Sequence, residues 1–571
     1  MKLSFIYFIL LFFLSNNLFS QTSLLDNGNW FKIAIVESGV FKIDKNFLEK
    51  NNISIDNVDP KKIQVYGTGY NGVLPQLNSL SNKINPEEIQ LKFYGNSDSF
   101  FDNDEFLYFY LQSSDKIHFD SISDRIKTEK NIYTDTAYYF ININGDLSRE
   151  INLEASTNSF EDEVSDVFFN YRYENDLYNI IQSGRYWYGE IFSPGNSLNI
   201  PLNEFFIQNS KVSLELGLVS RSTVPSSFSI TIDNTELAVF EMNTINEGIY
   251  GNKILSQVET IDFNYLSNEE FVNLKYFGNN SAISYLDYVD ITGIIGLSYI
   301  GENLLFYSIP ENRSLFRKYN ISTNTNHGID KDGNHNLKFW NISNPYNIIE
   351  LKTFKENDNY YIIKNDSSFS RNILFDIENL NYPLFSKEVG NSNILNNNNP
   401  DLLIITHSDF FQDAQRIKSL REDEGLDVSI TNVNDIYNQF SSGNQDVSAI
   451  RNYIKYIYNT SSKKLKYVLL FGDCSYDYKD RVPNNTNYIP IYQSYNSSNN
   501  IYSFSSDDYF GFLESDEGIW IEDSNGDHDL EVSIGRIPSN NNSDSKDYVD
   551  KLYTYSIKNQ VKGDWKKNIY L

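Results

Sequence analysis

The run Leu402-Leu403-Ile404-Ile405 is the clearest structural signal in the C-terminal part of the chain. Four apolar residues without polar alternation are typical of a strand buried on both faces of a sheet. Residues 467–471 form a second run of this kind, and residues 428–430 form a shorter one. The segments 410–420 and 447–458 lie between these runs and carry apolar residues three and four positions apart, which predicts helices. The alternation of strand and helix predicts a parallel sheet covered by helices.

The chain before this module has the composition of a β-rich protein. It contains 42 Tyr and 40 Phe, residues that favour strands, and Asn-rich stretches punctuate the apolar segments. Residues 30–43 predict a hairpin, and Gly293 predicts a bend between strands at 285–291 and 294–300. We therefore expect a multidomain chain. Its predicted parts are a signal peptide at 1–20, sandwich-like β-rich domains at 21–155 and 156–395, and an α/β module at 396–571.

The first residues have the pattern of a secretory signal peptide. Lys2 precedes an apolar run from Leu3 to Leu14, and small and polar residues follow, which predicts cleavage between Ser20 and Gln21. The run is shorter than the roughly 20 residues that a membrane-spanning helix needs. An N-terminal membrane anchor is the alternative. No other stretch predicts a transmembrane helix, so we expect an exported protein.

Charge and cysteine content narrow the function classes. The formal net charge is −29, which disfavours binding to nucleic acid or to anionic lipid. The chain has one cysteine, Cys474, so an exported protein of this sequence has no internal disulfide. The folded state is then stabilised by a large hydrophobic core, and a bound metal ion is a second candidate source of stability.

Cys474 is the one candidate thiol nucleophile. It follows the buried strand at 467–471, at a position where α/β enzymes place their active sites. A catalytic thiol needs a base, and His407 follows the other buried strand of the same predicted sheet. The carboxylate of Asp473 next to the thiol raises rather than lowers its pKa. We therefore expect Cys474 to be inert, with a Cys474–His407 pair as the alternative.

The segment 521–531 is a candidate cation site. It holds five carboxylates in eleven positions, and hard oxygen ligands in a flexible loop suit calcium. The spacing begins like an EF-hand loop but places His528 where the glycine belongs and Ile534 where the bidentate glutamate belongs. A solvated acidic turn is the alternative. The segment 330–335 is a poorer cluster of the same type and is interpreted as a turn.

Several stretches resemble the gingipain-type cysteine peptidases. In the C-terminal part these stretches are 401–406, 467–473, 506–509 and 531–537. The N-terminal part is similar to the region that precedes the catalytic module in the sortase-like peptidases of the type IX secretion system. There the matching stretches are 30–34, 39–43, 65–67, 184–190 and 285–289. The order of these stretches, rather than any single one, carries the resemblance.

The resemblance implies a cell-surface cysteine endopeptidase at the outer membrane. Such an enzyme removes the C-terminal signal domain of type IX cargo and works with outer-membrane secretion components. Gingipain modules have two α/β halves, and the catalytic His and Cys lie in the second, so the resemblance places both beyond Leu571. It also implies a structural calcium held by Asp473, Asp527 and Glu531 through side chains and by Ser524 and Asp529 through backbone carbonyls.

Two further expectations concern completeness and activity. Residues 567–571 resemble the opening of another strand, and domains rarely end inside a strand, so we expect a truncated chain without peptidase activity of its own. The alternative function is a non-enzymatic exported surface protein that binds a partner through its β-domains. We expect no nucleic-acid partner for either function.

Overall fold

The structure is a computed structural model of the whole chain. It describes residues 22–55, 58–68, 72–78, 84–96, 98–123, 125–143, 145–155, 157, 159–202, 206–233, 235–246, 248–266, 271–309, 316–323, 327–329, 335–396, 399–520 and 527–557. Within those ranges, no helix is both long and apolar enough to cross a bilayer. The predicted signal cleavage site and the expected strand at 567–571 lie outside the described residues, as does most of the acidic turn at 330–335.

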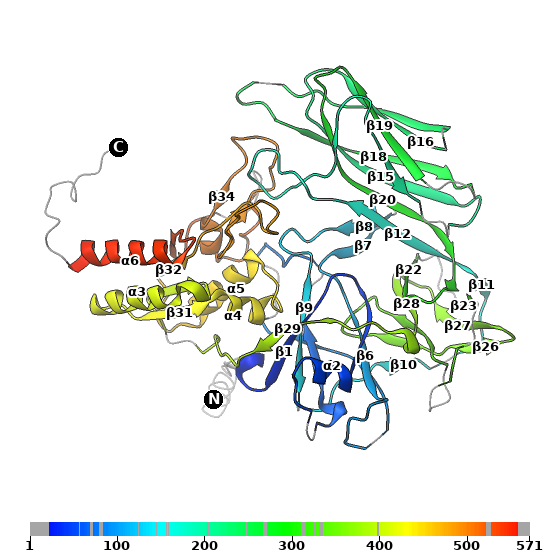
Figure 1. Cartoon of the computed structure of the whole chain (residues 1–571), viewed down its shortest axis with the longest axis horizontal. Helices are drawn as coiled ribbons and strands as arrows, with labels where there is room; N and C mark the ends of the chain where they lie inside the picture. The colour runs from blue at the N-terminus through cyan, green and yellow to red at the C-terminus, as the bar shows by residue number, and fades with distance from the viewer. Residues whose placement is uncertain are drawn as a thin grey trace, which may run out of the picture.

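An N-terminal β region packs two sheets face to face (Figure 1). The first sheet has the order β29-β1-β9-β3-β4, with β1 at Asn29–Ile35, β3 at Gln64–Gly67, β4 at Glu87–Ile89, β9 at Ala137–Ile143 and β29 at Leu384–Val389. The second sheet has the order β2-β6-β5, with β2 at Gly39–Asp44, β5 at Lys92–Tyr94 and β6 at Phe106–Leu111. Helix α2, Lys45–Lys50, follows β2, and β7, Lys116–Asp120, pairs with β8, Arg125–Glu129.

The predicted hairpin at residues 30–43 is wrong. β1 pairs with β9 and β29, and β2 pairs with β6, so the two strands lie in different sheets. Ile33 of β1 and Ile43 of β2 are both fully buried in one hydrophobic core. Packing the strands face to face covers both apolar sides, which pairing them edge to edge does not achieve.

A central β region at residues 152–376 contains the largest sheet. This ten-stranded sheet contains β10 at Asn152–Leu153, β12 at Asp166–Glu174, β13 at Ile191–Phe192, β15 at Lys211–Ser220, β18 at Leu255–Asn264, β20 at Ser284–Gly296, β22 at Leu304–Ser308, β24 at Leu337–Asn341, β25 at Ile349–Leu351 and β28 at Ser370–Asp376. Beside it lie β14 at Ser197–Pro201, β16 at Ser226–Ile232, β17 at Thr235–Glu241 and β19 at Phe271–Gly278 in one sheet. Another sheet contains β11 at Asp162–Val164, β21 at Ser298–Tyr299, β23 at Phe316–Thr323, β26 at Phe354–Glu356 and β27 at Asn359–Asn365.

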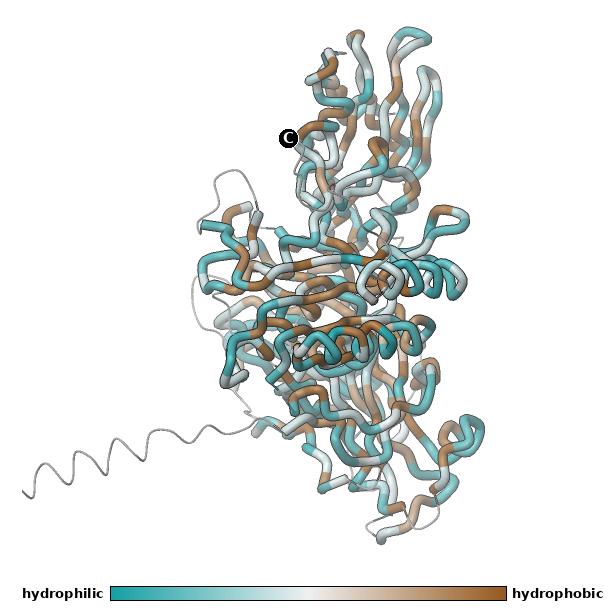
Figure 2. Tube along the Cα trace, turned by 90° about the vertical axis from the view of Figure 1, so that its left-hand side faces the viewer, coloured by the Kyte–Doolittle hydropathy of each residue, from teal (hydrophilic) through white to brown (hydrophobic). Residues whose placement is uncertain are grey.

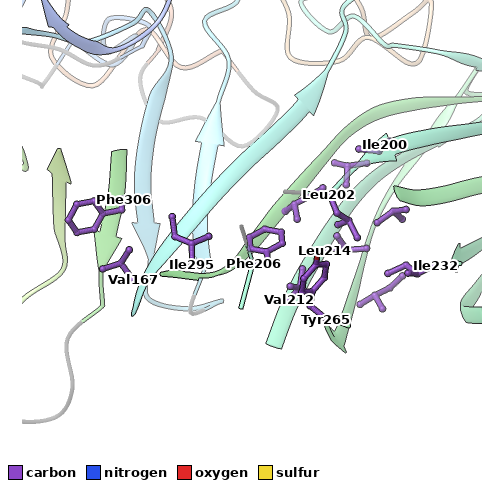
Figure 3. Packing of buried hydrophobic residues seen from close by; sticks show 14 of the residues in the cluster. Val167, Ile200, Leu202, Phe206, Val212, Leu214, Ile232, Tyr265, Ile295 and Phe306 are labelled. Atoms are coloured by element: carbon purple, nitrogen blue, oxygen red, sulfur yellow. The ribbon is translucent and has the colours of Figure 1, made fainter. Parts of the chain in front are cut away.

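The core of the central β region corrects a second expectation. Gly293 does not bend the chain, because β20 runs unbroken from Ser284 to Gly296. A Cβ atom at Gly293 would lie 2.6 Å from the ring of Phe206, so the glycine allows that ring to pack closely on the strand. Figure 3 shows Phe206 among the apolar side chains of this core, near Ile295, which lies in β20 as Gly293 does.

The two β regions are interleaved in sequence. β29 comes after the whole central β region, yet it returns to pair with β1 in the first sheet. Residues 384–389 therefore lie in the first sheet of the N-terminal β region, although they follow the central β region in sequence. In Figure 2 the apolar positions gather along the inner strands, and hydrophilic positions occupy most of the peripheral turns.

The α/β region confirms the predicted parallel sheet. Its strand order is β31-β30-β32-β35, all parallel, with β30 at Leu402–Thr406, β31 at Val428–Asn432, β32 at Tyr467–Phe471 and β35 at Ser533–Ile537. Its helices are α3 at Phe411–Asp423, α4 at Val433–Phe440, α5 at Val447–Thr460 and α6 at Asn542–Ile557. Two short strands, β33 at Tyr492–Gln493 and β34 at Ser505–Ser506, pair with each other in an antiparallel manner.

Alternate residues of β30 explain how the helices cover this sheet. Leu402 and Ile404 pack in one core with residues of α3 and α6, whereas Leu403 and Ile405 pack in another core with residues of α4 and α5. Both faces are therefore buried, as the unbroken apolar run predicts. Gly425, with φ of +91°, follows α3 in the left-handed region that favours glycine.

Candidate functional site

The carboxyl ends of the parallel strands bring together the residues singled out for catalysis. His407 follows β30, and Gly472, Asp473 and Cys474 follow β32. The strands pair in register, Thr406 with Phe471 and Phe471 with Ile537, so these segments share one edge of the sheet. This edge is where open α/β sheets place their binding sites.

The surroundings of Cys474 do not activate its thiol. The residue is half-buried, and burial is the main cause that raises the pKa of the thiol. Nearby Arg536 lowers this pKa, whereas the carboxylates of Asp507 and Asp473 raise it further. A nucleophilic cysteine needs surroundings that lower the pKa of its thiol, because the thiolate is the reactive form.

His407 has a structural role at the start of a helical turn. Its Nδ1 accepts a hydrogen bond from the backbone N–H of Asp409 at 3.3 Å, and its ring packs 5.0 Å from that of Tyr488. Burial lowers the pKa of the imidazole. Both residues of the alternative pair are described, and no hydrogen bond joins His407 to Cys474 in the structure. The arrangement does not form a catalytic dyad.

Arg536 organises this edge of the sheet. Its guanidinium donates from Nη1 to the carbonyl oxygens of Gly472 at 2.9 Å and Ile489 at 2.8 Å. It also forms a bidentate pair with Asp507, at 2.8 Å from Nε and 2.7 Å from Nη2. The stretches 506–509 and 531–537, quoted above for their resemblance, are thus joined by one ion pair, which the sequence did not reveal.

A buried carboxylate lies just before the acidic segment 521–531, and no signal in the sequence pointed to it. Glu517 is fully buried, and its Oε2 accepts from the backbone N–H of Glu514 at 3.0 Å. Its Oε1 has no hydrogen-bond partner among the described residues. Burial, together with the nearby carboxylates of Glu531 and Asp527, raises the pKa of Glu517 to about 6. The carboxylates of Glu531, Asp527 and Glu514 thus act on a buried carboxylate that has one oxygen without a donor.

The structure divides the expected calcium ligands between two places. Glu531 precedes β35, and its Oε2 accepts from the backbone N–H of Leu513 at 2.6 Å. Asp473 lies beyond the other end of β35, where its N–H donates to the carbonyl of Ser539 at 2.8 Å and its Oδ2 accepts from Thr486 at 2.6 Å. The five residues of β35 alone span about 13 Å, so Asp473 and Glu531 cannot hold one ion.

The remaining expected ligands have mixed outcomes. Asp527 is exposed, and its Oδ1 accepts from the backbone N–H of Asp529 at 2.9 Å. The side chain of Asp529 points to solvent, and Ser524 lies outside the described residues. No group of three or more His, Cys, Asp or Glu side chains with metal-binding geometry occurs among the residues that the structure describes.

Comparisons with known proteins fit this architecture. Residues 395–571 match the model of the family described as Peptidase family C25. The crystal structure of dimeric latent PorU from Porphyromonas gingivalis superposes with a TM-score of 0.79 at 20% sequence identity, over 96% of this chain and 51% of that chain. This chain thus spans about half the length of the PorU structure. No curated protein matches the sequence.

Another solved structure resembles only a small part of the chain. The carbohydrate-binding module CBM36 in complex with calcium and xylotriose covers 21% of this chain and 98% of its own, at 11% identity and a TM-score of 0.16. The chain therefore has the fold of the PorU structure, and its residues 395–571 match the model of Peptidase family C25.

Proposed function

We propose that the chain is the N-terminal half of an exported, surface-located cysteine endopeptidase of the type IX secretion system. The enzyme would remove the C-terminal signal domain of secreted cargo at the outer membrane, together with outer-membrane secretion components. One observation carries this proposal: 96% of the chain shares the fold of PorU, and its last segment matches a peptidase family.

In this proposal the reacting groups belong to a second α/β half that follows Leu571. A cysteine thiolate there attacks the scissile carbonyl carbon, and the amine leaves with a proton delivered by a histidine. The resulting thioester passes the acyl group to water or to an acceptor amine. The described α/β region supplies the scaffold, because its own thiol has a raised pKa and no histidine bonded to it.

The test compares the complete gene product with the isolated chain. Both are purified and incubated with a peptide that spans the junction between a cargo protein and its signal domain. The complete product should cleave the peptide, the isolated chain should not, and Cys474→Ala in the complete product should leave the rate unchanged. Cleavage by the isolated chain that Cys474→Ala abolishes would instead establish Cys474 as the nucleophile.

A non-enzymatic surface binding protein is the second candidate. The observation in its favour is that Cys474, the cysteine of the chain, has a raised pKa and no hydrogen bond to a histidine. If the reading frame ends at Leu571 in the native gene, this candidate replaces the peptidase proposal.

We also propose a structural calcium ion, with a ligand set that differs from the expected one. Glu517, Asp527 and Glu531 would contribute ligands, since the buried Oε1 of Glu517 has no donor and the other two carboxylates lie close enough to raise its pKa. These three side chains do not have metal-binding geometry as they stand, so the ion would have to draw them together. A divalent cation removes this repulsion and supplies the missing partner. Asp473 is not part of this set.

A further inference from the structure

Segment 72–78 of the N-terminal β region lies between β3 and β4 in sequence and is held by the α/β region. The backbone N–H of Leu74 donates to Asp446 Oδ2 at 3.0 Å, and the guanidinium of Arg451 donates to the carbonyl oxygen of Pro75 at 3.4 Å. The side chain of Leu74 is buried in the same hydrophobic core as residues of α4 and α5. The segment is therefore a direct link between the two regions.

Asn78 ends this segment and contacts the residues just before the acidic segment 521–531. Its backbone N–H donates to the carbonyl oxygen of Glu517 at 2.8 Å, and its Nδ2 donates to the carbonyl oxygen of Phe512 at 2.5 Å. The second bond fixes the orientation of the side-chain amide, because only its nitrogen can donate. The side-chain oxygen Oδ1 of Asn78 has no hydrogen-bond partner among the described residues.

Two buried oxygens at this contact thus lack a donor. Asn78 is 6% exposed and Glu517 is fully buried, and the atoms without a partner are Oδ1 of the first and Oε1 of the second. Burying an acceptor without a partner is unfavourable, so buried polar atoms are rarely left in this state. A calcium ion is a suitable common partner, since both atoms are hard oxygens and one of them belongs to a carboxylate.

The charges around this contact also favour a cation. Lys455 donates to the backbone carbonyl of Asn78 at 3.3 Å, and Arg451 donates to backbone carbonyls of the same segment. Neither cation forms an ion pair with Glu517 within the described part of the chain. Against these two cations stand Glu517 and the three carboxylates that raise its pKa. The excess of negative charge leaves room for a metal ion.

We propose that Asn78 Oδ1 is a ligand of the structural calcium ion, so that the ion joins the N-terminal β region to the α/β region. This inference rests on the calcium site proposed above. It adds a ligand from outside the segment 395–571 that matches the peptidase family, and it gives the ion a second role, which is to hold segment 72–78 in place.

Calorimetric titration of the purified, chelator-treated chain with CaCl₂ tests the ligand. We expect Asn78→Ala to weaken calcium binding at least about tenfold, because losing even a group that only supports the ligands of a metal site costs roughly 10–100-fold in affinity. Asn78→Asp keeps an oxygen at this position and adds negative charge. It should bind calcium at least as tightly as the wild type.

Gln76→Ala is the matched control. Gln76 lies in the same segment, and its Oε1 accepts from the Tyr495 hydroxyl at 3.1 Å, so this variant also loses a contact between the regions. Its calcium affinity should be that of the wild type. An equal loss of affinity in Gln76→Ala and Asn78→Ala would show that Asn78 acts through the position of the segment and is not a ligand.

The outcomes separate this inference from the calcium site on which it rests. If the wild type binds calcium, Glu517→Gln abolishes the binding and Asn78→Ala retains the full affinity, the role of Asn78 is wrong and the site stands. If the wild type takes up no calcium at millimolar concentration, both are wrong.

Hydrogen exchange measures the second role of the ion. The amides of Leu74 and Asn78 both donate to acceptors in the α/β region. At a calcium concentration of one hundred times the dissociation constant, their exchange should slow by up to about a hundredfold relative to the chelated protein. Amides of β20 should not respond. Exchange at Leu74 and Asn78 that is the same with and without bound calcium would show that the ion does not hold the segment.

Discussion

Arg185 of the central β region donates two hydrogen bonds to the carbonyl oxygen of Gln493 in the α/β region, from Nε at 3.1 Å and from Nη2 at 2.6 Å. The guanidinium also lies 3.7 Å from the centre of the Tyr495 ring, and the residue is only 7% exposed. The neighbouring N–H of Gly184 donates to Gln493 Oε1 at 3.0 Å. One short segment thus inserts into the peptidase-like part and fixes its position against the β regions.

Arg185→Ala should therefore loosen the junction. It leaves a buried carbonyl without a donor and removes a planar group from an aromatic ring, which together cost about 2–4 kcal/mol. Thermal unfolding should shift to lower temperature, and limited proteolysis should cut the segment near Gln493 sooner. Arg221→Ala is the control, since Arg221 is exposed and, among the described residues, its guanidinium donates only to the Tyr285 hydroxyl, at 3.4 Å. Equal stability of the two variants would show that the insertion is dispensable.

The proposed calcium site predicts a specific response to the metal. Millimolar Ca²⁺ should raise the unfolding temperature, and a ligand at one hundred times its dissociation constant stabilises by about 2.7 kcal/mol. Glu517→Gln should remove that shift. The variant should also be more stable than the wild type without calcium, because it relieves the repulsion by Asp527 and Glu531.

Glu514→Gln is the matched control for this experiment. Glu514 is exposed and donates its backbone N–H to Glu517, which the substitution leaves in place. Its carboxylate also raises the pKa of Glu517, as those of Glu531 and Asp527 do, but it is not one of the proposed ligands. The calcium shift should persist in this variant. A wild-type chain whose unfolding temperature is unaffected by millimolar Ca²⁺ would rule out the site.

The sequence predicted the α/β sheet because the signals for it are local. The unbroken run at β30 and the helical spacing in α3 and α5 each lie within a single element. Strand pairing in the β regions is not local, since β1 finds its partner β29 some 350 positions later along the chain. The hairpin at 30–43 was the nearest pairing in sequence, but it was not the one that buried both apolar faces.

In the candidate site, too, local signals could be found in the sequence, whereas non-local contacts could not. Asp473 and Glu531 both flank strands, but only the register of β32 against β35 shows that they lie at opposite ends. Glu517 was missed because its burial depends on a distant segment, whose Asn78 N–H donates to the Glu517 carbonyl at 2.8 Å. A dense acidic sequence identifies where charge accumulates, and the tertiary structure determines which carboxylates meet.

Cys474 should react slowly with iodoacetamide. Burial and the carboxylates of Asp507 and Asp473 raise its pKa, so little thiolate exists at pH 6. We expect the folded chain to be alkylated more slowly than the same chain in denaturant, with rates followed by mass spectrometry. Faster reaction in the folded state would indicate a depressed pKa and would revive the Cys474–His407 alternative.

Asp287→Asn should change the stability of the chain in a pH-dependent manner. Burial, followed by the nearby carboxylate of Glu174, raises the pKa of Asp287 to about 7, whereas an aspartate in the unfolded chain titrates near 3.9. Between these values the folded state holds a proton that the unfolded state has released. The contribution of protonated Asp287 to the free energy of unfolding is therefore fully present below about pH 4, and it is lost as the pH rises through about 7. A difference of about three units corresponds to at most about 4 kcal/mol, since one unit is worth about 1.4 kcal/mol.

The asparagine variant cannot ionise and should escape this loss. We expect its urea midpoint to match that of the wild type at pH 4.5 and to exceed it at pH 8. Asp290, whose pKa burial also raises to about 7, remains in both proteins and does not contribute to the difference between them. A difference between variant and wild type that is the same at both pH values would mean that folding does not shift the pKa of Asp287, and would contradict the prediction.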